Sequence, residues 1–196
     1  MPRDSLAVLD DDALLVLYAN GDPDAARLLA KRLVPRLTGY AGRLLSDRTE
    51  AEDVAQEAML RLWKLAPDWR SGEAKVSTWV YRVAGNLCTD RLRTRQRRRS
   101  EPLDEVAEPE SGAASVVAGM IEADRMAALD AALATLPERQ REAVVLRHIE
   151  GMSNPEIAEI LQIGVEAVES LTARGKRALA AALSGQREAL GYEEAE

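Results

Sequence analysis

The chain has 196 residues, which is enough for one large domain or two small ones. Phenylalanine is absent and the strong helix formers alanine, leucine, arginine and glutamate dominate, so we expect an all-α fold. The net charge of −7 argues on average against nucleic-acid binding, and a single cysteine excludes a disulfide framework. One cysteine and one histidine are also too few for a zinc site of their own, and we expect neither a metal nor a cofactor.

Two helices are predicted in the first third of the chain. Asp22 before Pro23 is typical of an N-cap followed by proline at the first helical position, and the apolar spacing continues to about Leu45. We expect Pro35 to kink this helix. The second helix is predicted to open at residues 49–52, Thr-Glu-Ala-Glu, which have the spacing of a capping box. Its polar face carries Asp53, Gln56, Glu57 and Arg61.

A long helix is predicted from about Val76 to Arg98, after a loop at residues 67–74 that contains Pro, Asp, Ser and Gly. Cys88 lies in its apolar part, and we interpret it as a small core residue rather than a reactive thiol. The buried stripe of this helix is predicted to contain Val76, Val80, Val83, Ala84 and Leu87. A different, mostly polar face carries Trp79, Arg82, Asn86, Asp90 and Arg93.

Charge is segregated in the middle of the chain. Residues 91–99 contain six arginines and no acid, whereas residues 101–124 contain seven acids and no base. Prolines and glycines accompany the acids, which indicates a flexible linker. We therefore predict two small helical domains joined by an acidic linker. Their expected bounds are 1–98 for the first domain, 99–120 for the linker, 121–185 for the second domain and 186–196 for an acidic tail.

The second domain has the pattern of a helix-turn-helix. Helices are predicted at residues 121–136 and 138–150, with Gly151 as the stop of the latter. A capping box from Ser153 to Glu156 opens a short helix to about Gln162, and a last helix runs over residues 166–183 after a turn at 163–164. The angle between the two should be filled by Ile157, Ala158, Ile160, Leu161, Ile163, Val168 and Leu171. An ordinary helical hairpin with a solvated charged face is the alternative.

Two groups of residues could contact nucleic acid. The second helix of a helix-turn-helix enters the major groove, and here its polar surface holds Ser170, Arg174, Lys176 and Arg177. Arginines on a helix that also presents Trp79 and Asn86 suit unpaired nucleic acid, since they neutralise phosphates while the ring stacks and the amide reads a base edge. The alternative is that Trp79 belongs to the core and the arginines form a solvated face.

Three segments together resemble the extracytoplasmic-function (ECF) sigma factors of the sigma-70 superfamily. Residues 53–63 resemble the D-x-x-Q-E-x-x-x-x-x-W pattern of region 2, and residues 76–93 resemble its T-W-x-x-x-I-A-x-N-x-x-x-D-x-x-R pattern. Residues 136–142 and 150–158 resemble region 4. The resemblance covers about residues 12–183 and implies a DNA-binding specificity subunit of bacterial RNA polymerase.

This resemblance assigns roles to particular residues. It implies docking on core polymerase by Asp53, Gln56, Glu57 and Arg61. It implies contacts with the promoter −10 element by Trp69, Arg70, Lys75, Trp79, Arg82, Asn86, Asp90, Arg91 and Arg93. It implies contacts with the −35 element by Ser170, Arg174, Lys176 and Arg177. The acidic linker would pass through the polymerase interior.

The recognition helix departs from the family pattern. Gln162 stands where the family often has glycine at the turn, and Glu169 and Leu171 stand where it usually has basic residues. Glu166 and Glu169 near the start of the helix would repel phosphates, which leaves Ser170 and Arg174 as the better base readers.

The resemblance implies an alternative sigma factor that acts with core RNA polymerase and promoter DNA and is regulated by an anti-sigma factor. A sigma-like decoy that binds an anti-sigma factor, and a helix-turn-helix transcriptional regulator, are the alternatives. We recognise no nucleophile and base set and no phosphate-binding glycine loop, so we expect no enzyme activity and no small-molecule substrate. The absence of a signal-peptide pattern and of a long apolar run predicts a cytoplasmic protein without membrane insertion.

Overall fold

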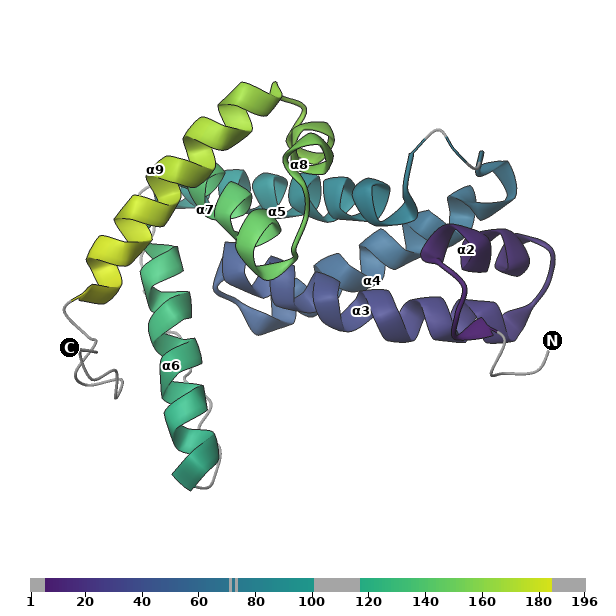
Figure 1. Cartoon of the computed structure of the whole chain (residues 1–196), viewed down its shortest axis with the longest axis horizontal. Helices are drawn as coiled ribbons and strands as arrows, with labels where there is room; N and C mark the ends of the chain where they lie inside the picture. Colours follow the sequence, from purple (N-terminus) through teal and green to yellow (C-terminus); the bar gives the residue numbers. More distant parts are fainter. Residues whose placement is uncertain (1–5, 71, 73, 101–116, 185–196) are drawn as a thin grey trace.

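The computed structural model describes residues 6–70, 72, 74–100 and 117–184, and every regular element in these ranges is a helix (Figure 1). The N-terminal bundle consists of α2 (Asp11–Ala19), α3 (Pro23–Leu45), α4 (Arg48–Leu65), the short 3₁₀ helix η1 (Ala66–Asp68) and α5 (Val76–Ser100). The C-terminal helices are α6 (Val117–Ala134), α7 (Glu138–Val144), the π-helical turn η2 (Val145–Ile149), α8 (Asn154–Leu161) and α9 (Val165–Ser184). The expectation of an all-α fold is confirmed.

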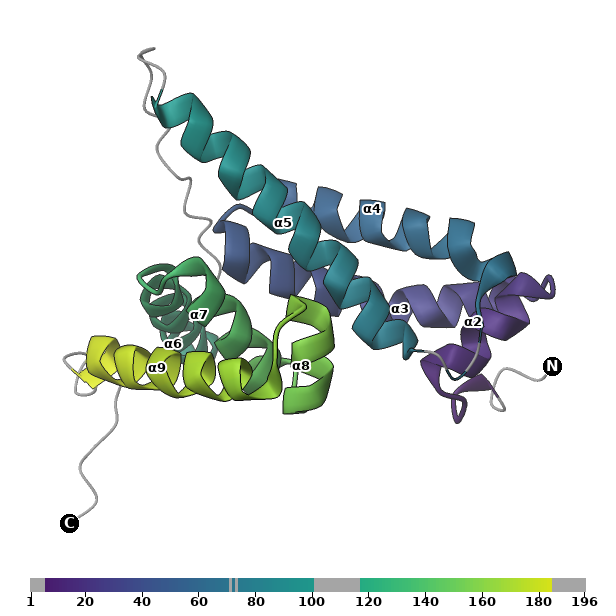
Figure 2. The ribbon, with the colours of Figure 1, turned by 90° about the horizontal axis from the view of Figure 1, so that it is seen from above.

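The N-terminal bundle is built on α3, which packs against α4 and α5, with α2 near one end (Figure 2). The leucines at positions 29, 33 and 37 of α3 recur at helical spacing and are fully buried. Asp22 caps α3 as predicted, because its carboxylate accepts hydrogen bonds from the backbone N–H groups of Asp24 and Ala25. Pro35 lies inside α3, which continues to Leu45.

The start of α4 differs from the prediction. Asp47 is the N-cap, and its carboxylate accepts a hydrogen bond of 2.9 Å from the backbone N–H of Glu50, so the predicted capping box beginning at Thr49 is wrong. The reason lies one residue earlier, where Ser46 ends α3 in the left-handed conformation with φ 52° and leaves Asp47 extended. A carboxylate at the N-cap contributes about 1 kcal/mol to helix stability, and Thr49 is already inside the helix.

The N-terminus of the long helix α5 is capped by a side chain from α2. The carboxylate of Asp12 in α2 accepts a hydrogen bond of 3.1 Å from the backbone N–H of Val76. Cys88 is buried, and burial raises the pKa of its thiol to about 12, which confirms that it is a core residue. Of the predicted stripe, Val83 and Leu87 are only half-buried; the members that are buried are Val76, Val80 and Ala84.

The C-terminal helices end in a helix-turn-helix formed by α8 and α9. The predicted capping box is present, because Ser153 and Glu156 exchange hydrogen bonds across the first turn of α8. Gly151 ends the preceding turn at φ 73°, also as predicted. The predicted helix over 138–150 is divided, since α7 ends at Val144 and a π-helical turn follows. The left-handed residue of the turn after α8 is Gln162, at φ 54°.

The predicted linker and tail lie largely outside the described residues. α5 extends to Ser100 and α6 begins at Val117, so both ends of the predicted range 99–120 are helical, and residues 101–116 and 185–196 are outside the description. None of the described helices is both long and apolar enough to cross a membrane.

The two sets of helices touch each other. α8 packs against α5, and α7 packs against α3, while α6 extends away from the body of the molecule (Figures 1 and 2). The buried apolar residues form one cluster that continues from α3 and α5 into α7, α8 and α9. The C-terminal helices therefore rest on the N-terminal bundle.

Candidate nucleic-acid interface

The polar face of α5 carries four of the predicted DNA-binding residues in a row. Asn86, Asp90 and Arg93 are exposed, and Arg82 is half-buried one turn before them. Arg93 lies 3.9 Å from Asp90, which is a loose ion pair between two exposed side chains. A spacing of three to four residues places these groups on one side of the helix, as the sequence predicted. Together they line one wall of a cavity of about 480 Å³.

Trp69, Arg70 and Trp79 lie at or near the start of α5. Trp79 is half-buried and packs against the core, so one part of the indole supports the fold and another part faces solvent. Trp69 also packs against the core, and its indole nitrogen is buried. Arg70 is exposed. The packing agrees with the core interpretation for part of the ring, and stacking against a base stays a prediction.

The arginine-rich end of α5 is not a uniform basic surface. Arg91 donates a hydrogen bond to the backbone carbonyl of Glu50. Arg95 donates to the carbonyl of Leu45 and forms ion pairs of 2.9 Å with Asp47 and 3.0 Å with Glu50. Both arginines therefore tie α5 to the junction of α3 and α4. The sequence could not reveal this, since the acceptors lie about 40 to 50 positions earlier in the chain.

Lys75 is paired across the molecule. Its ammonium lies 2.7 Å from the carboxylate of Glu156 at the start of α8. The hydrogen bond from Lys75, together with those from Ser153, lowers the pKa of Glu156 to about 2. In this structure the Lys75 ammonium forms an ion pair with Glu156, and its contact with DNA stays a prediction.

A second surface lies on α4. Asp53, Gln56 and Arg61 are exposed and Glu57 is half-buried, with a hydrogen bond of 2.8 Å from Arg61 to Glu57. Leu60 is on the same side of the helix and its side chain is 53% exposed. Leu60 was not predicted as a surface residue, although its spacing from Asp53 and Gln56 places it on the same side of the helix. A single exposed leucine is common on protein surfaces, so Leu60 by itself identifies no interface.

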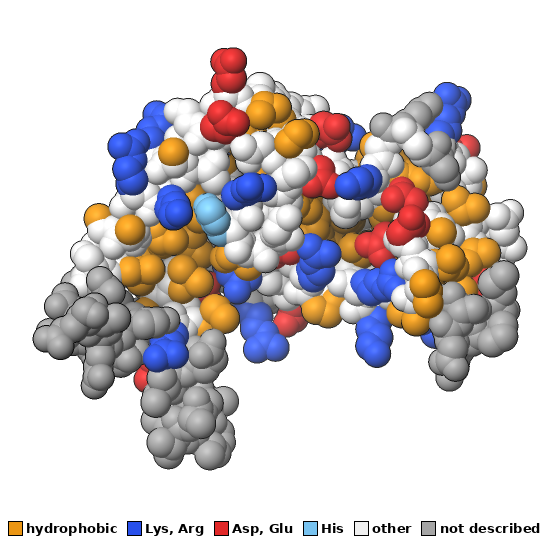
Figure 3. Space-filling model, viewed as in Figure 1, with side chains coloured by type: hydrophobic (Ala, Val, Ile, Leu, Met, Phe, Trp, Pro, Cys, Tyr) orange, Lys and Arg blue, Asp and Glu red, His pale blue; other side chains and the backbone are white. Residues whose placement is uncertain are grey.

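The third surface is the outer face of α9. Ser170, Arg174, Lys176 and Arg177 are all exposed, as the sequence predicted for a recognition helix. Figure 3 shows Lys and Arg side chains along the outer edge of α9 and acidic side chains near its junction with α8. Glu166 and Glu169 are exposed at that junction, and Glu169 accepts a hydrogen bond of 3.5 Å from Asn154.

His148 lies close to this surface in the η2 turn. Most of the residue is exposed. The part that is buried, together with the charges of Lys176 and Arg147, lowers the pKa of the imidazole.

Comparisons with known proteins show the family of the chain. The protein family described as Sigma-70 region 2 matches residues 29–98, and the family described as Sigma-70, region 4 matches residues 126–179. RNA polymerase sigma-H factor of Pseudomonas aeruginosa is 32% identical over 88% of this chain and 93% of its own length. ECF RNA polymerase sigma factor SigW of Bacillus subtilis is 34% identical over 81% of this chain and 89% of its own length.

The chain belongs to the ECF sigma factors. It is an alternative sigma factor that directs RNA polymerase to promoters. Solved structures agree with this fold. CnrH in complex with the cytosolic domain of CnrY superposes with a TM-score of 0.66 at 26% identity, over 89% of the sigma factor described here and 97% of that chain. RpoE of Bartonella quintana, in complex with the anti-sigma factor NepR, superposes with a TM-score of 0.64 at 22% identity, over 81% and 96%.

Proposed function

We propose that this sigma factor uses its three exposed surfaces for three separate contacts: α4 for core polymerase, α5 for the melted −10 element and α9 for the duplex −35 element. The observation that carries the proposal is the exposed row of Asn86, Asp90 and Arg93 on α5, in a chain that also presents a basic helix-turn-helix face. Each surface alone is small, and linking them on one chain raises the effective concentration of the second DNA contact.

The α4 surface suits a protein partner. Asp53 and Gln56 offer exposed polar groups, and Leu60 adds an apolar anchor between them and Arg61. Interfaces commonly combine a central apolar side chain with a polar rim. In the proposed complex Leu60 is desolvated by core polymerase, whereas Asp53, Gln56, Glu57 and Arg61 form the rim.

The α5 surface suits unpaired DNA. The amide of Asn86 has both a donor and an acceptor for the edge of an unstacked base. Arg82 and Arg93 can neutralise phosphates, and the exposed part of Trp79 can stack against a base. These contacts exist only with the separated strand, so they offset the free energy of opening the duplex. The mechanism needs no covalent step, and the protein acts as an initiation factor rather than as an enzyme.

The α9 surface suits duplex DNA. Ser170 and Arg177 point away from the buried side of α9, which is formed by residues such as Val168 and Gly175. Arg174 lies one turn after Ser170 and can make a bidentate contact with guanine. Glu166 borders this face, so we propose that the −35 contacts are made by the later turns of the helix.

The partners follow from this arrangement. Core RNA polymerase and promoter DNA are the direct ones, and the complexes of CnrH with CnrY and of RpoE with NepR support an anti-sigma factor as a third. The bounds 1–98 and 121–185 are proposed as the region 2 and region 4 domains, with 99–120 as the linker between them. The site of action is that of the polymerase, in the cytoplasm.

Run-off transcription tests this function. Core polymerase and a pool of genomic fragments should give new transcripts with defined 5′ ends only when this protein is added. Transcripts that are identical with and without the protein would overturn the proposal.

A further inference from the structure

The start of α5 has no cap from its own N-terminal residue. The helix begins at Val76, and the residue before it is Lys75, whose ammonium group donates hydrogen bonds but cannot accept them. The first turn also contains no acidic residue. The N–H groups at the start of a helix have no partner within the helix, so α5 needs an acceptor from elsewhere in the molecule.

Asp12 in α2 is that acceptor. Its carboxylate accepts the hydrogen bond of 3.1 Å from the backbone N–H of Val76, which is 64 positions later in the chain. A negative charge at this place also interacts favourably with the positive end of the helix dipole. Most N-caps act within one turn of the chain, whereas this one joins two helices that are distant in sequence.

The Asp12 carboxylate also interacts with the residues on either side of the start of α5. Burial raises the pKa of this carboxyl group, and the hydrogen bond from Val76 lowers it. The indole N–H of Trp69 lowers this pKa too, although it is buried without a hydrogen bond of full geometry to any described residue. The charge of Asp12 contributes to the raised pKa of Lys75, after the larger effects of Glu156. Asp12 therefore lies near the residue that ends η1 and the residues that begin α5.

α2 is itself held on the bundle. Arg32 of α3 donates a hydrogen bond of 2.7 Å to the carbonyl of Leu9 and lies 3.1 Å from the carboxylate of Asp11. At the other end of α2, the ring of Tyr18 lies edge to face with Trp63 of α4, at 4.6 Å. These contacts fix α2 on both α3 and α4, so Asp12 is presented to α5 from a fixed position.

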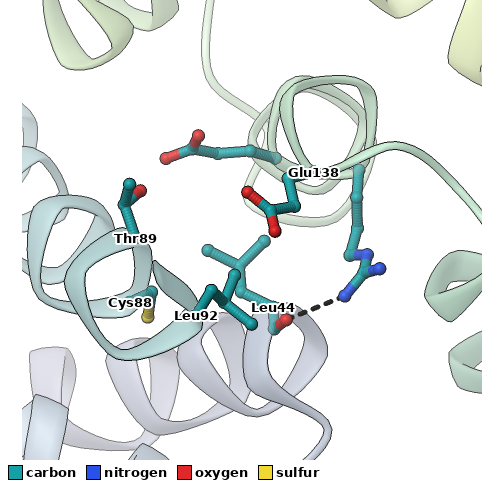
Figure 4. Close-up of a pocket in the computed structure, with 7 residues that line it drawn as sticks. Leu44, Cys88, Thr89, Leu92 and Glu138 are labelled. Atoms are coloured by element: carbon teal, nitrogen blue, oxygen red, sulfur yellow. Dashed lines mark hydrogen bonds between the residues drawn. The ribbon is translucent and has the colours of Figure 1, made fainter. Parts of the chain in front are cut away.

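The middle of α5 is held in a different way, by packing. Figure 4 shows Leu44 of α3, Cys88 and Leu92 of α5 and Glu138 of α7 around a space of only about 20 Å³. Such close packing leaves this part of the helix little freedom to shift. The first turn of α5 lies about three turns earlier, and there the backbone is joined to α2 through Asp12.

Three of the residues assigned to the −10 element lie around this turn. Trp69 ends η1, Lys75 precedes α5 and Trp79 lies in the first turn of the helix. α2 packs against both η1 and α5, so it sets the distance between the two indoles (Figure 1). A site selects its ligand only when its groups are held within about 0.5 Å of the required geometry. A small shift of the first turn would therefore change the fit to a base while the fold remained intact.

We propose that Asp12 is a positioning residue for −10 recognition, which holds Val76 and Trp69 in place without touching DNA itself. This inference rests on the proposed function, since it concerns the residues assigned to the −10 element. Loss of the carboxylate should change which bases are preferred in that element. The preference for the −35 sequence should not change, because α9 lies in the other set of helices.

Asp12→Ala tests this role, and Asp22→Ala is its matched control. Asp22 is also an N-cap aspartate, but it caps its own helix α3 through the N–H groups of Asp24 and Ala25. The two variants lose the same chemical group from the same kind of position, so a general loss of stability should affect both. Asp12→Asn is the conservative variant, since asparagine caps helices about as well as aspartate.

Base preference is measured by run-off transcription with core polymerase from a promoter pool with randomised −10 positions and a transcribed barcode on each template. Asp12→Ala should reduce the ratio between the preferred base and the others by about fivefold, the effect of losing one helix cap. Asp12→Asn should stay within about twofold of the parent. Asp22→Ala should keep the parent's preference, and a second pool with a randomised −35 element should give the same result for every variant.

Hydrogen exchange measured by mass spectrometry reports the cap without DNA. Peptides that contain the first turn of α5 should exchange about fivefold faster in Asp12→Ala than in the parent protein, and Asp22→Ala should not change them. Unchanged exchange would overturn the role of Asp12 as the cap of α5. This measurement does not depend on the proposed function.

A folded Asp12→Ala variant with the parent's −10 preference would overturn the positioning role, and so would an equal change of preference in Asp22→Ala. If Asp12→Ala does not fold, Arg32→Met replaces it, because Arg32 holds α2 on α3 and its loss should produce the same change of preference. An unchanged preference in that variant would overturn the role as well. A parent protein without promoter-dependent transcripts would instead overturn the proposed function.

Discussion

The Tyr40 hydroxyl donates a hydrogen bond of 2.9 Å to the carboxylate of Glu142, and this bond joins the middle of the N-terminal bundle to the first helix before the helix-turn-helix. Tyr40 is fully buried, and burial raises the pKa of Glu142 while the hydrogen bond lowers it. A buried carboxylate without a donor is costly, so this position of α7 depends on the tyrosine. The hydrogen bond therefore helps to hold α7 against the N-terminal bundle.

Replacement of Asn86 should separate promoter opening from promoter binding. Asn86→Ala removes the exposed amide on α5 and should reduce strand opening by about tenfold, since a base contact contributes about 1–3 kcal/mol. Permanganate reactivity of unpaired thymines in the −10 element measures opening, and a filter-binding assay measures duplex binding by the holoenzyme. Asn20→Ala, at the end of α2, is the control. Equal loss in both assays would show that Asn86 does not act on the melted strand.

Replacement of Arg174 should affect the duplex contact alone. Arg174→Ala removes an exposed guanidinium from α9 and should weaken the preference for the native −35 sequence by about tenfold. Transcription from promoters with native and scrambled −35 elements measures this preference. A preference that is unchanged in the variant would remove Arg174 from the proposed site.

Leu60 should contribute to the affinity for core polymerase. Leu60→Ala truncates an exposed apolar side chain between polar residues of α4 and should weaken binding by about tenfold, as a moderate interface hot spot does. Val165→Ala truncates a comparably exposed residue on α9 and serves as the control. Titration of labelled protein with core polymerase measures both. If the two variants bind with the parent's affinity, the interface does not include Leu60.

The crossing of α7 and α9 should depend on Gly175. A Cβ at this position would lie 2.5 Å from a methyl carbon of Val144 and 3.2 Å from the carbonyl oxygen of Gln140. Gly175→Ala should therefore lower the free energy of unfolding by about 1–3 kcal/mol, even though alanine favours the helix. Gly164→Ala adds its methyl group to open space and should change little. Urea unfolding of both variants checks this, and similar midpoints would contradict the close packing.

These positions show which parts of the protein the sequence could predict. Asp22, Ser153 and Gly151 mark helix ends through local rules, and the structure has them in those roles. The start of α4 was missed because Asp47 and Thr49 both have cap-forming side chains, and the choice depended on the left-handed backbone of Ser46 before them. A helix end with one possible capping residue could be predicted from the sequence, whereas the start of α4, with two possible capping residues, could not.

The contacts of the candidate site were less predictable. The resemblance to sigma region 2 assigned Arg91 and Lys75 to the −10 contacts. The structure gives Arg91 to the Glu50 carbonyl and Lys75 to Glu156. Both partners are distant in the chain, and no periodic pattern records which acceptor a long flexible side chain reaches.

Acid should reveal the Lys75 contact. Because the hydrogen bond from Lys75 helps to lower the pKa of Glu156 to about 2 from its usual 4.5, the contact stabilises the fold above pH 4.5 and is lost as the pH falls toward 2. Lys75→Met should therefore show a smaller decline in Tm between about pH 5 and pH 3 than the parent protein. Parallel declines in the two proteins would mean that the pair does not stabilise the fold.

Size-exclusion chromatography of this protein with core RNA polymerase at low salt, without any anti-sigma factor present, tests most directly whether it docks on polymerase. We expect a one-to-one complex with the core enzyme. A chain that elutes entirely separately from the core enzyme under these conditions would contradict it.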